Sequence, residues 1–189
     1  MKQIVYNGSD VTDEEVDRVV NKVRGVVINK NGQIMLCRNA GIYLLPGGSI
    51  EENEDLVQGL KREIFEEGGE MQIDESRTTP FLQIKSYNRN YYDRKLKRPI
   101  NRLTVTSFFE TYTEDDIVPE KLHLTESEKE KKFMPFFTNL SSVDYIISSN
   151  PNTDNEKREE FDREMRTVLR EYGEFKKKAK NLDDDSEER

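Results

Sequence analysis

The hydrophobic positions of the chain follow two periods, and these predict where strands and helices lie. Short apolar or alternating stretches rich in β-branched and aromatic residues predict strands at residues 2–6, 24–28, 33–38, 42–45, 81–92 and 101–112. Apolar residues recur every three or four positions at residues 56–64 and 161–172, which predicts two amphipathic helices. Residues 133–147 are rich in aromatic and aliphatic residues and are expected to join the core. This order of elements predicts an α/β (α+β) fold.

The segment at residues 10–23 carries signals for both a helix and a strand. Thr12 and Glu15 have the spacing of a capping box, and the valines that follow recur at helical spacing, which favours a helix. Valine is also favoured in strands, so a strand stays open as the alternative. Asn31 and Gly32, between the next two strands, predict a β-hairpin.

The stretch at residues 45–71 concentrates acidic chemistry on one helix. It reads LPGGSIEENEDLVQGLKREIFEEGGEM, a Pro-Gly-Gly turn followed by a helix with carboxylates at Glu63, Glu66 and Glu67. Such i, i+3, i+4 like charges destabilise a helix by about 0.2–0.5 kcal/mol per pair, which a bound cation would offset. Carboxylate oxygens suit Mg²⁺, Ca²⁺ or Mn²⁺. The alternative is a solvated acidic helix face, although these glutamates flank the apolar stripe instead of opposing it.

Residues 48–70 resemble the Nudix box, the signature of hydrolases that cleave nucleoside diphosphates linked to another moiety. The resemblance rests on Gly48, on Glu54, and on the run at residues 62–69, REIFEEGG. The last position departs from the pattern, because Glu70 stands where an aliphatic residue is usual. The resemblance implies a Nudix-type αβα sandwich around a mixed β-sheet at residues 23–172, and the apolar spacing from residue 161 adds a long C-terminal helix. Residues 1–22 would be an N-terminal extension, and residues 173–189 a charged tail that we expect to be disordered.

The resemblance also assigns roles in the chemistry. Glu63, Glu66 and Glu67, with the backbone carbonyl of Gly47, would hold Mg²⁺ (or Mn²⁺). Arg62 and Glu54 would orient the glutamates through a salt bridge. Members of the family often add a carboxylate from a later loop, here residues 114–130, where Glu126 and Glu128 both fit. For the general base we take Glu63, with Glu126 as the alternative.

Candidate substrate contacts come from two places. Arg38 ends a strand shortly before the glycine turn, where an arginine resembles a phosphate contact of several family members; a solvated strand-end arginine is the alternative. Residues 85–102 carry seven Lys or Arg against one acid, Asp93. Arg89 there could take a phosphate, and Tyr87 could stack on a base, at a position similar to that of a tyrosine in dinucleoside polyphosphate hydrolases. The alternative is a hairpin with a solvated, charged tip and tyrosines in cross-strand pairs.

Composition narrows the class of partner. The 189 residues have a formal net charge of −8, which argues against general binding of nucleic acid or anionic membrane. No apolar run approaches the ~20 residues of a membrane span, and we find no signal peptide. Cys37 is the one cysteine, so we expect a reduced, cytoplasmic compartment. The C-terminal helix could dock on its own domain or on a second subunit, which leaves a homodimer possible.

The sequence leaves two candidate functions. One is a divalent-metal-dependent pyrophosphohydrolase acting on a small nucleotide-type substrate, with nucleotides or dinucleoside polyphosphates favoured. The other is a non-catalytic Nudix-like module that binds a nucleotide or regulates another protein. Such modules commonly lose box glutamates, and none is lost here, which favours the enzyme.

Overall fold

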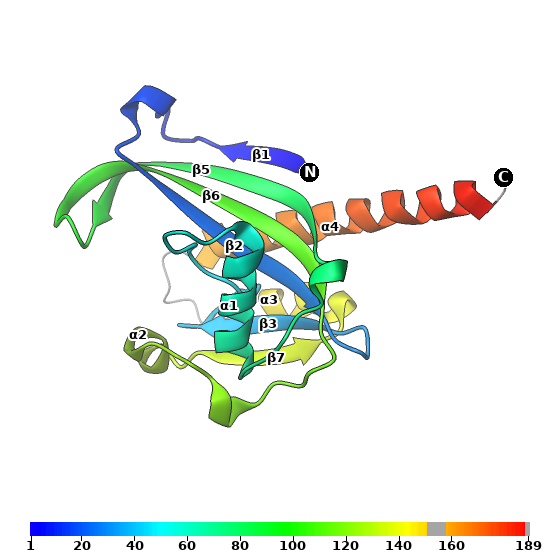
Figure 1. Ribbon diagram of the computed structural model, residues 1–189. Helices are drawn as coiled ribbons and strands as arrows, with labels where there is room; N and C mark the ends of the chain where they lie inside the picture. Colours follow the sequence, from blue (N-terminus) through cyan, green and yellow to red (C-terminus); the bar gives the residue numbers. More distant parts are fainter. Residues whose placement is uncertain (151–157, 188–189) are drawn as a thin grey trace.

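The computed structural model describes residues 1–150 and 158–187, with side chains described as far as residue 181. The strands are β1 (Lys2–Tyr6), β2 (Arg18–Ile28), β3 (Ile34–Asn39), β4 (Ile42–Leu44), β5 (Thr79–Asp93), β6 (Arg98–Tyr112) and β7 (Met134–Thr138). The α-helices are α1 (Leu56–Gly68), α2 (Glu126–Glu130), α3 (Val143–Ser148) and α4 (Arg158–Glu187). Figure 1 shows the sheet between α1 on one side and α3 and α4 on the other.

The strands form one mixed sheet in the order β1-β5-β6-β2-β3-β4, with β7 paired to β3. Leu60 and Ile64 of α1 pack on one face of the sheet, against Val23 and Val27. A second apolar cluster on the opposite face contains core residues of β2, β5 and β6 together with residues of α3 and α4, among them Val143, Ile147, Met165, Val168 and Tyr172. The predicted α+β class and αβα sandwich are confirmed.

The helix favoured at residues 10–23 is wrong. Thr12 and Glu15 do form a capping box, but it closes only a single 3-10 turn, Asp13–Glu15. The valines that follow belong to β2, which pairs in parallel with β6 from Arg18 to Ile28. Ladder hydrogen bonds to a partner strand outweigh a weak local preference for helix. The predicted domain boundary at residue 23 therefore falls inside a strand, and β1 also joins the sheet through β5.

The strands β2 and β3 separate soon after the hairpin that joins them. Their register consists of one pair, Ile28 with Ile34. Further along, the free edge of β2 bonds to the glycine turn: the Gly25 N–H donates to Pro46 O, and the Val23 N–H donates to Gly48 O, each at 3.0 Å. The divergence leaves a wedge in the sheet, and the Pro-Gly-Gly turn lies in it.

The helix α4 docks on the domain of its own chain and is longer than expected. Its stripe of Met165, Val168 and Tyr172 is buried against the sheet. The stripe continues to Phe175, whose ring centroid lies 5.6 Å from that of Phe81. The disordered tail predicted from residue 173 differs from the structure, where α4 is helical to Glu187; residues 188–189 lie outside the described residues. Within the described ranges, no helix is long and apolar enough to cross a membrane.

The first turn of α4 beyond Tyr172 should stabilise the domain. Removing residues 173–189 deletes the Phe175 contact and the Lys176–Glu110 ion pair of 2.9 Å. We expect a loss of about 2 kcal/mol, which lowers the Tm by about 4–8 °C in calorimetry. Removing residues 178–189 keeps both contacts and should leave the Tm within about 2 °C. Equal Tm values for the two truncations would contradict this account of the helix.

Candidate functional site

A cavity of about 210 Å³ lies where the glycine turn, α1 and α2 meet. Three carboxylates line it: Glu63 and Glu67 from α1, and Glu128 from α2. Gly47, Gly48 and Ser49 of the turn line it as well, together with Arg24 of β2 and Cys37 of β3. The wedge between β2 and β3 therefore becomes a pocket lined by carboxylates.

Local sequence fixes the helix that carries two of these carboxylates. The Asp55 side chain caps the start of α1 by accepting hydrogen bonds from the N–H groups of Val57 and Gln58. The helix ends at Gly69, whose φ of +75° is the left-handed conformation that favours glycine. Leu60 and Ile64 face the core, which holds the neighbouring glutamates at the edge of the buried face.

Glu67 is the most deeply buried of the three carboxylates, with 7% of its surface exposed. It accepts a hydrogen bond of 2.8 Å from the Gly47 N–H, and the Cys37 Sγ lies 3.8 Å from the same oxygen. Burial raises the pKa of Glu67 to about 8, against the lowering effect of the Gly47 hydrogen bond. An ionised carboxylate with so few donors is costly to bury, so this position favours a nearby cation.

Arg62 joins two other box residues. Its Nε and Nη2 donate to the two oxygens of Glu54 at 2.7 and 3.1 Å, and its Nη1 donates to Glu63 at 3.0 Å. The Arg62 hydrogen bond lowers the pKa of Glu54, whereas burial raises that of Glu63. The geometry suits Arg62 and Glu54 for holding Glu63 in place, and that role stays a prediction.

The two glycines of the turn are required by the space around them. Gly47 has a φ of +132°, and a Cβ there would lie 2.2 Å from the backbone oxygen of Val23. A Cβ at Gly48 would lie 2.4 Å from a carboxylate oxygen of Glu63. No other residue fits without movement of β2 or Glu63, because Cβ atoms do not approach this closely.

The two carboxylates predicted in the loop, Glu126 and Glu128, have different surroundings in the structure. Glu128 lines the cavity, and one of its oxygens accepts hydrogen bonds of 2.8 Å from both the N–H and the hydroxyl of Thr125. The Glu126 side chain is 85% exposed and pairs with Lys129. Two positions on a helix differ by about 200°, so both could not face the cavity. The geometry places Glu128 and not Glu126 at the cavity, and the role of either residue stays a prediction; the spacing of Thr125 and Glu128 as a capping box was the signal missed.

The other predicted site residues lie outside the lining. Glu66 does not line the cavity; its carboxylate is 3.5 Å from Arg62 Nη1. The Tyr87 hydroxyl donates to Asp13 at 2.6 Å, and Arg89 bonds to Glu15 and to two backbone carbonyls of the N-terminal segment. These two residues hold that segment on the sheet, and their role in substrate binding stays a prediction. Arg38, on β3, has a buried Nε without a hydrogen-bond partner.

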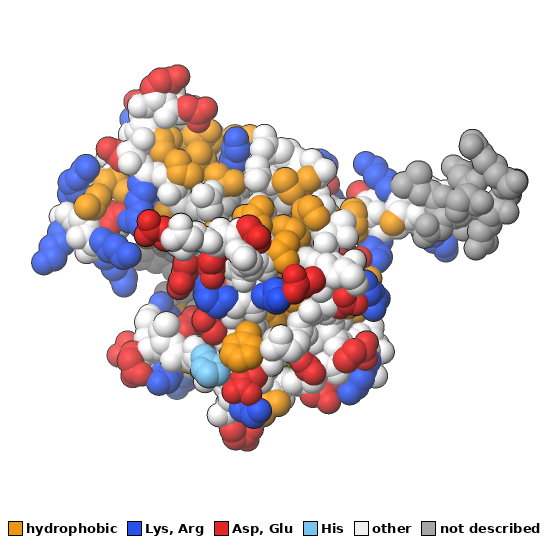
Figure 2. All heavy atoms as spheres, viewed as in Figure 1, with side chains coloured by type: hydrophobic (Ala, Val, Ile, Leu, Met, Phe, Trp, Pro, Cys, Tyr) orange, Lys and Arg blue, Asp and Glu red, His pale blue; other side chains and the backbone are white. Residues whose placement is uncertain are grey.

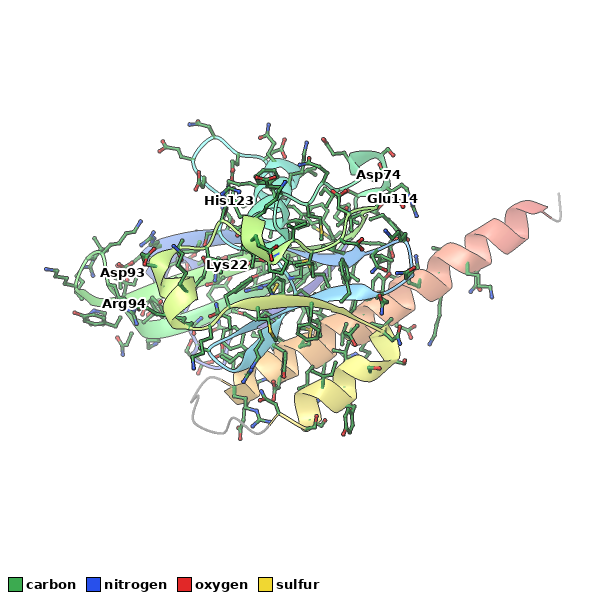
Figure 3. The ribbon with its side chains drawn as sticks, turned by 90° about the horizontal axis from the view of Figure 1, so that it is seen from below. Lys22, Asp74, Asp93, Arg94, Glu114 and His123 are labelled. Carbon is green, nitrogen blue, oxygen red and sulfur yellow. The ribbon has the colours of Figure 1, made fainter. Side chains whose placement is uncertain are left out.

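The basic segment at residues 85–102, here called the basic hairpin, joins β5 to β6 and has side chains on both faces of the sheet. Figure 2 shows Lys and Arg side chains gathered at its tip, where Asp93 and Arg94 lie in Figure 3. Asp93 pairs with Arg18 at 2.6 Å, and Tyr91 stacks under Arg102, whose Cζ lies 3.4 Å from the ring centroid. Arg102 is at an even position of β6, on the face that α4 covers, whereas Lys85 of β5 is on the face of α1.

Sequence reasoning also missed a group of cations beside the cavity. Lys22, Arg24 and Arg102, here called the cation group, share the α4 face of β2 and β6. Burial, together with the charges of Arg24 and Arg102, lowers the pKa of Lys22 to about 8. The alternation of polar Lys22 and Arg24 with Val23 was the available signal, since a polar residue on both sides of a core valine is unusual for a buried strand.

The residues around the cavity fit a divalent cation in chemistry. Among the described residues, no group of three Asp, Glu, His or Cys side chains already has the geometry to hold a metal ion. Glu63 and Glu67 nevertheless have raised pKa values because they are buried, and Glu128 adds a third carboxyl group to the lining. Oxygen donors of this kind suit Mg²⁺ or Mn²⁺ more than Zn²⁺.

Comparison with known proteins assigns the family. The NUDIX domain model matches residues 20–138, so the chain belongs to the NUDIX family, and it is a hydrolase acting on phosphorus-containing acid anhydrides. No curated protein matches the chain.

Solved structures similar to this chain include three Nudix-type proteins. A MutT protein from Bacillus halodurans has 16% identity and a TM-score of 0.48, covering 67% of this chain and 72% of its own. A NUDIX hydrolase from Nitrosomonas europaea has 11% identity and a TM-score of 0.47, with 72% and 82% covered. An Ap4A hydrolase from C. elegans has 16% identity and a TM-score of 0.46, with 84% and 98% covered.

The burial of Lys22 predicts a pH-dependent gain in stability for Lys22→Met. Its pKa of about 8 in the folded state lies below the ordinary 10.5, so the charged form penalises folding at neutral pH. At pH 7 the substitution should add up to about 3 kcal/mol to the free energy of unfolding. The gain should shrink as pH rises from about 8 to about 10.5, where Lys22 becomes neutral in both states.

Denaturant unfolding at pH 7, 9 and 10.5 measures this difference, and Lys95→Met at the exposed hairpin tip is the control. A gain for Lys22→Met that does not change with pH would show that packing, and not charge, is responsible.

Proposed function

We propose that the protein is a Mg²⁺- or Mn²⁺-dependent pyrophosphohydrolase that cleaves a nucleoside diphosphate linked to another moiety, with nucleotides or dinucleoside polyphosphates favoured. The observation that carries the proposal is the cavity in which Glu63, Glu67 and Glu128 meet beside the Gly47–Gly48 turn. Carboxylates from two separate elements converge on the turn where Gly47 and Gly48 allow close approach of the backbone.

The chemistry of the substrate explains this arrangement. The anionic oxygens of a pyrophosphate repel nucleophiles, so the site must neutralise them and position a water molecule. Glu63, Glu66 and Glu67, with the carbonyl of Gly47, would hold the cation, which supplies neutralising charge and makes a bound water more acidic. Glu66 would reach it by leaving Arg62 Nη1, 3.5 Å away. Arg24 lines the same cavity and adds a positive charge for substrate oxygens.

Glu128 is suited to take the proton from water. Thr125 binds one of its oxygens with two hydrogen bonds, which fixes the side chain and leaves the other oxygen to accept. Glu63 is bound by Arg62, so its oxygens are less available as a base. We therefore prefer Glu128 to Glu63 as the general base.

We propose a small molecule as the substrate and neither nucleic acid nor membrane as a partner, consistent with the net charge of −8. A cytoplasmic location suits the buried free thiol of Cys37, which burial keeps protonated by raising its pKa. A homodimer stays a prediction; the apolar stripe of α4 that suggested it is used within the chain.

Hydrolysis should require the buried carboxylate of the box. We expect Glu67→Gln to lower kcat/KM by at least about 100-fold on any substrate turned over, because it removes a charge that holds the cation. A panel of nucleoside triphosphates, dinucleoside polyphosphates and nucleotide sugars, assayed with Mg²⁺ or Mn²⁺ for released phosphate or nucleotide, measures this. Glu52→Gln, in the exposed loop before α1, is the matched control. Absence of turnover across the panel would refute the proposed function.

The two loop glutamates give a sharper test of the base. Glu128→Gln should lower kcat by about 10²–10⁴-fold with little change in KM, as expected for loss of a general base. Glu126→Gln, two residues away and bound to Lys129, should keep the wild-type kcat. Circular dichroism and Tm values confirm that both variants fold. Equal activity of the two variants would exclude Glu128 as the base.

A further inference from the structure

The cation group lies on the α4 face of the sheet, and Phe161 and Met165 of α4 line a small cavity together with Arg24 at one end of the group. Lys22 and Arg24 alternate along β2, about 7 Å apart, and so face the same side. Arg102 and Thr104 alternate in the same way along β6, and the register places them on the same face as Lys22. Apolar packing of α4 on this face starts further along, at Phe108 and Val26.

The charged groups here make few bonds to the protein: an Nη of Arg24 donates to the Leu45 carbonyl, and the Arg102 guanidinium stacks on Tyr91. No ion pair within 4.0 Å joins Lys22, Arg24 or Arg102 to a carboxylate among the described residues. Arg102 Nε and Thr104 Oγ1 are buried with no hydrogen-bond partner. Buried polar atoms in a folded protein are normally bonded, so unpaired donors gathered in one place indicate a missing ligand. Their charge requires that ligand to be an anion.

Two carboxylates oppose the cation group. Glu164 of α4 is half-buried and lies near Arg24 and Lys22, whose charges act against the rise of its pKa caused by burial. Glu63 also acts on Lys22 but is paired with Arg62, so two carboxylates against three cations leave a positive excess. The neighbouring α4 residues Glu160 and Arg163 have opposite charges and offset each other.

The cation group neighbours two cavities. Arg24 lines the cavity of the box carboxylates, and the backbone of Lys22 pairs with Ser49 of its rim. On the other side, Arg102 and Thr104 pair with Asn88 and Ser86 of β5, which line a second cavity of about 140 Å³ under the start of α4. An anion bound by Lys22 and Arg102 would therefore lie between the two cavities.

We infer that Lys22 and Arg102 bind a phosphate group of the substrate beyond the scissile pyrophosphate, so that the enzyme prefers chains of three or more phosphates. This inference rests on the proposed function, which sets where the bond is cleaved. A substrate with two phosphates, such as a nucleotide sugar, fills the box cavity alone and leaves the cation group without a partner. A longer chain continues across Arg24 to Lys22 and Arg102, and its far end reaches the second cavity.

A series of diadenosine compounds with two, three and four phosphates tests the inference, because only the number of phosphates changes. The ratio of kcat/KM for four phosphates to that for two should exceed about tenfold in the wild type. Lys22→Met and Arg102→Gln should each lower this ratio about tenfold, mainly through KM, since each removes a charged hydrogen-bond donor. Lys85→Met removes the same charge from the opposite face of the sheet and should leave the ratio unchanged.

Binding provides a readout that needs no turnover. Calorimetry with inorganic tripolyphosphate and with pyrophosphate, in EDTA, should show tighter binding of tripolyphosphate by the wild type and about tenfold weaker binding by Lys22→Met. Failure of the proposed function would appear as no hydrolysis of any compound, and the calorimetry would still decide this inference. Equal affinity for the two anions, or an equal loss in Lys85→Met, would overturn it.

Discussion

The burial of one carboxylate beside a glycine turn organises the active region of this protein. Glu67 can lie at 7% exposure because the Gly47 N–H reaches it, and Gly47 can do so because β2 has parted from β3. The turn then satisfies the free edge of β2 with its own backbone hydrogen bonds. The Glu67 carboxylate, the glycine turn and the edge of β2 thus depend on one another, and a change in any of the three disturbs the other two.

The sequence was sufficient for the sandwich and for the box helix, since these depend on local periodicity, caps and a fixed spacing of residues. It was insufficient where contacts with residues distant in the sequence determine the local structure. The valines before Val23 were assigned to a helix because their pairing with β6, more than eighty residues later, is invisible locally. Tyr87 and Arg89 looked available for substrate because their acidic partners, Asp13 and Glu15, lie in a segment judged unrelated to the site.

The two faces of the sheet carry side chains of opposite charge. The face of α1 supplies carboxylates, and the face of α4 supplies Lys22, Arg24 and Arg102, with Arg24 common to both regions. The basic hairpin, read from sequence as one surface, contributes Arg102 to this division, and its tip remains solvent-exposed. In the proposed function, affinity for substrate and chemistry on the scissile bond would therefore come from side chains that can vary independently.

The hydrogen bonds that hold β1 against α4 have a consequence for synthesis of the protein. Lys2 bonds to Glu171 at 2.7 Å, and the Tyr6 hydroxyl bonds to Thr167 at 3.1 Å, across 169 and 161 residues of chain. A ribosome releases β1 first, yet β5, its partner in the sheet, and α4, which fastens it, follow much later. Throughout that interval the strand has an open edge, the state in which nascent chains associate wrongly. The lysine and glutamine that β1 carries next to its valine and isoleucine would keep that waiting edge soluble.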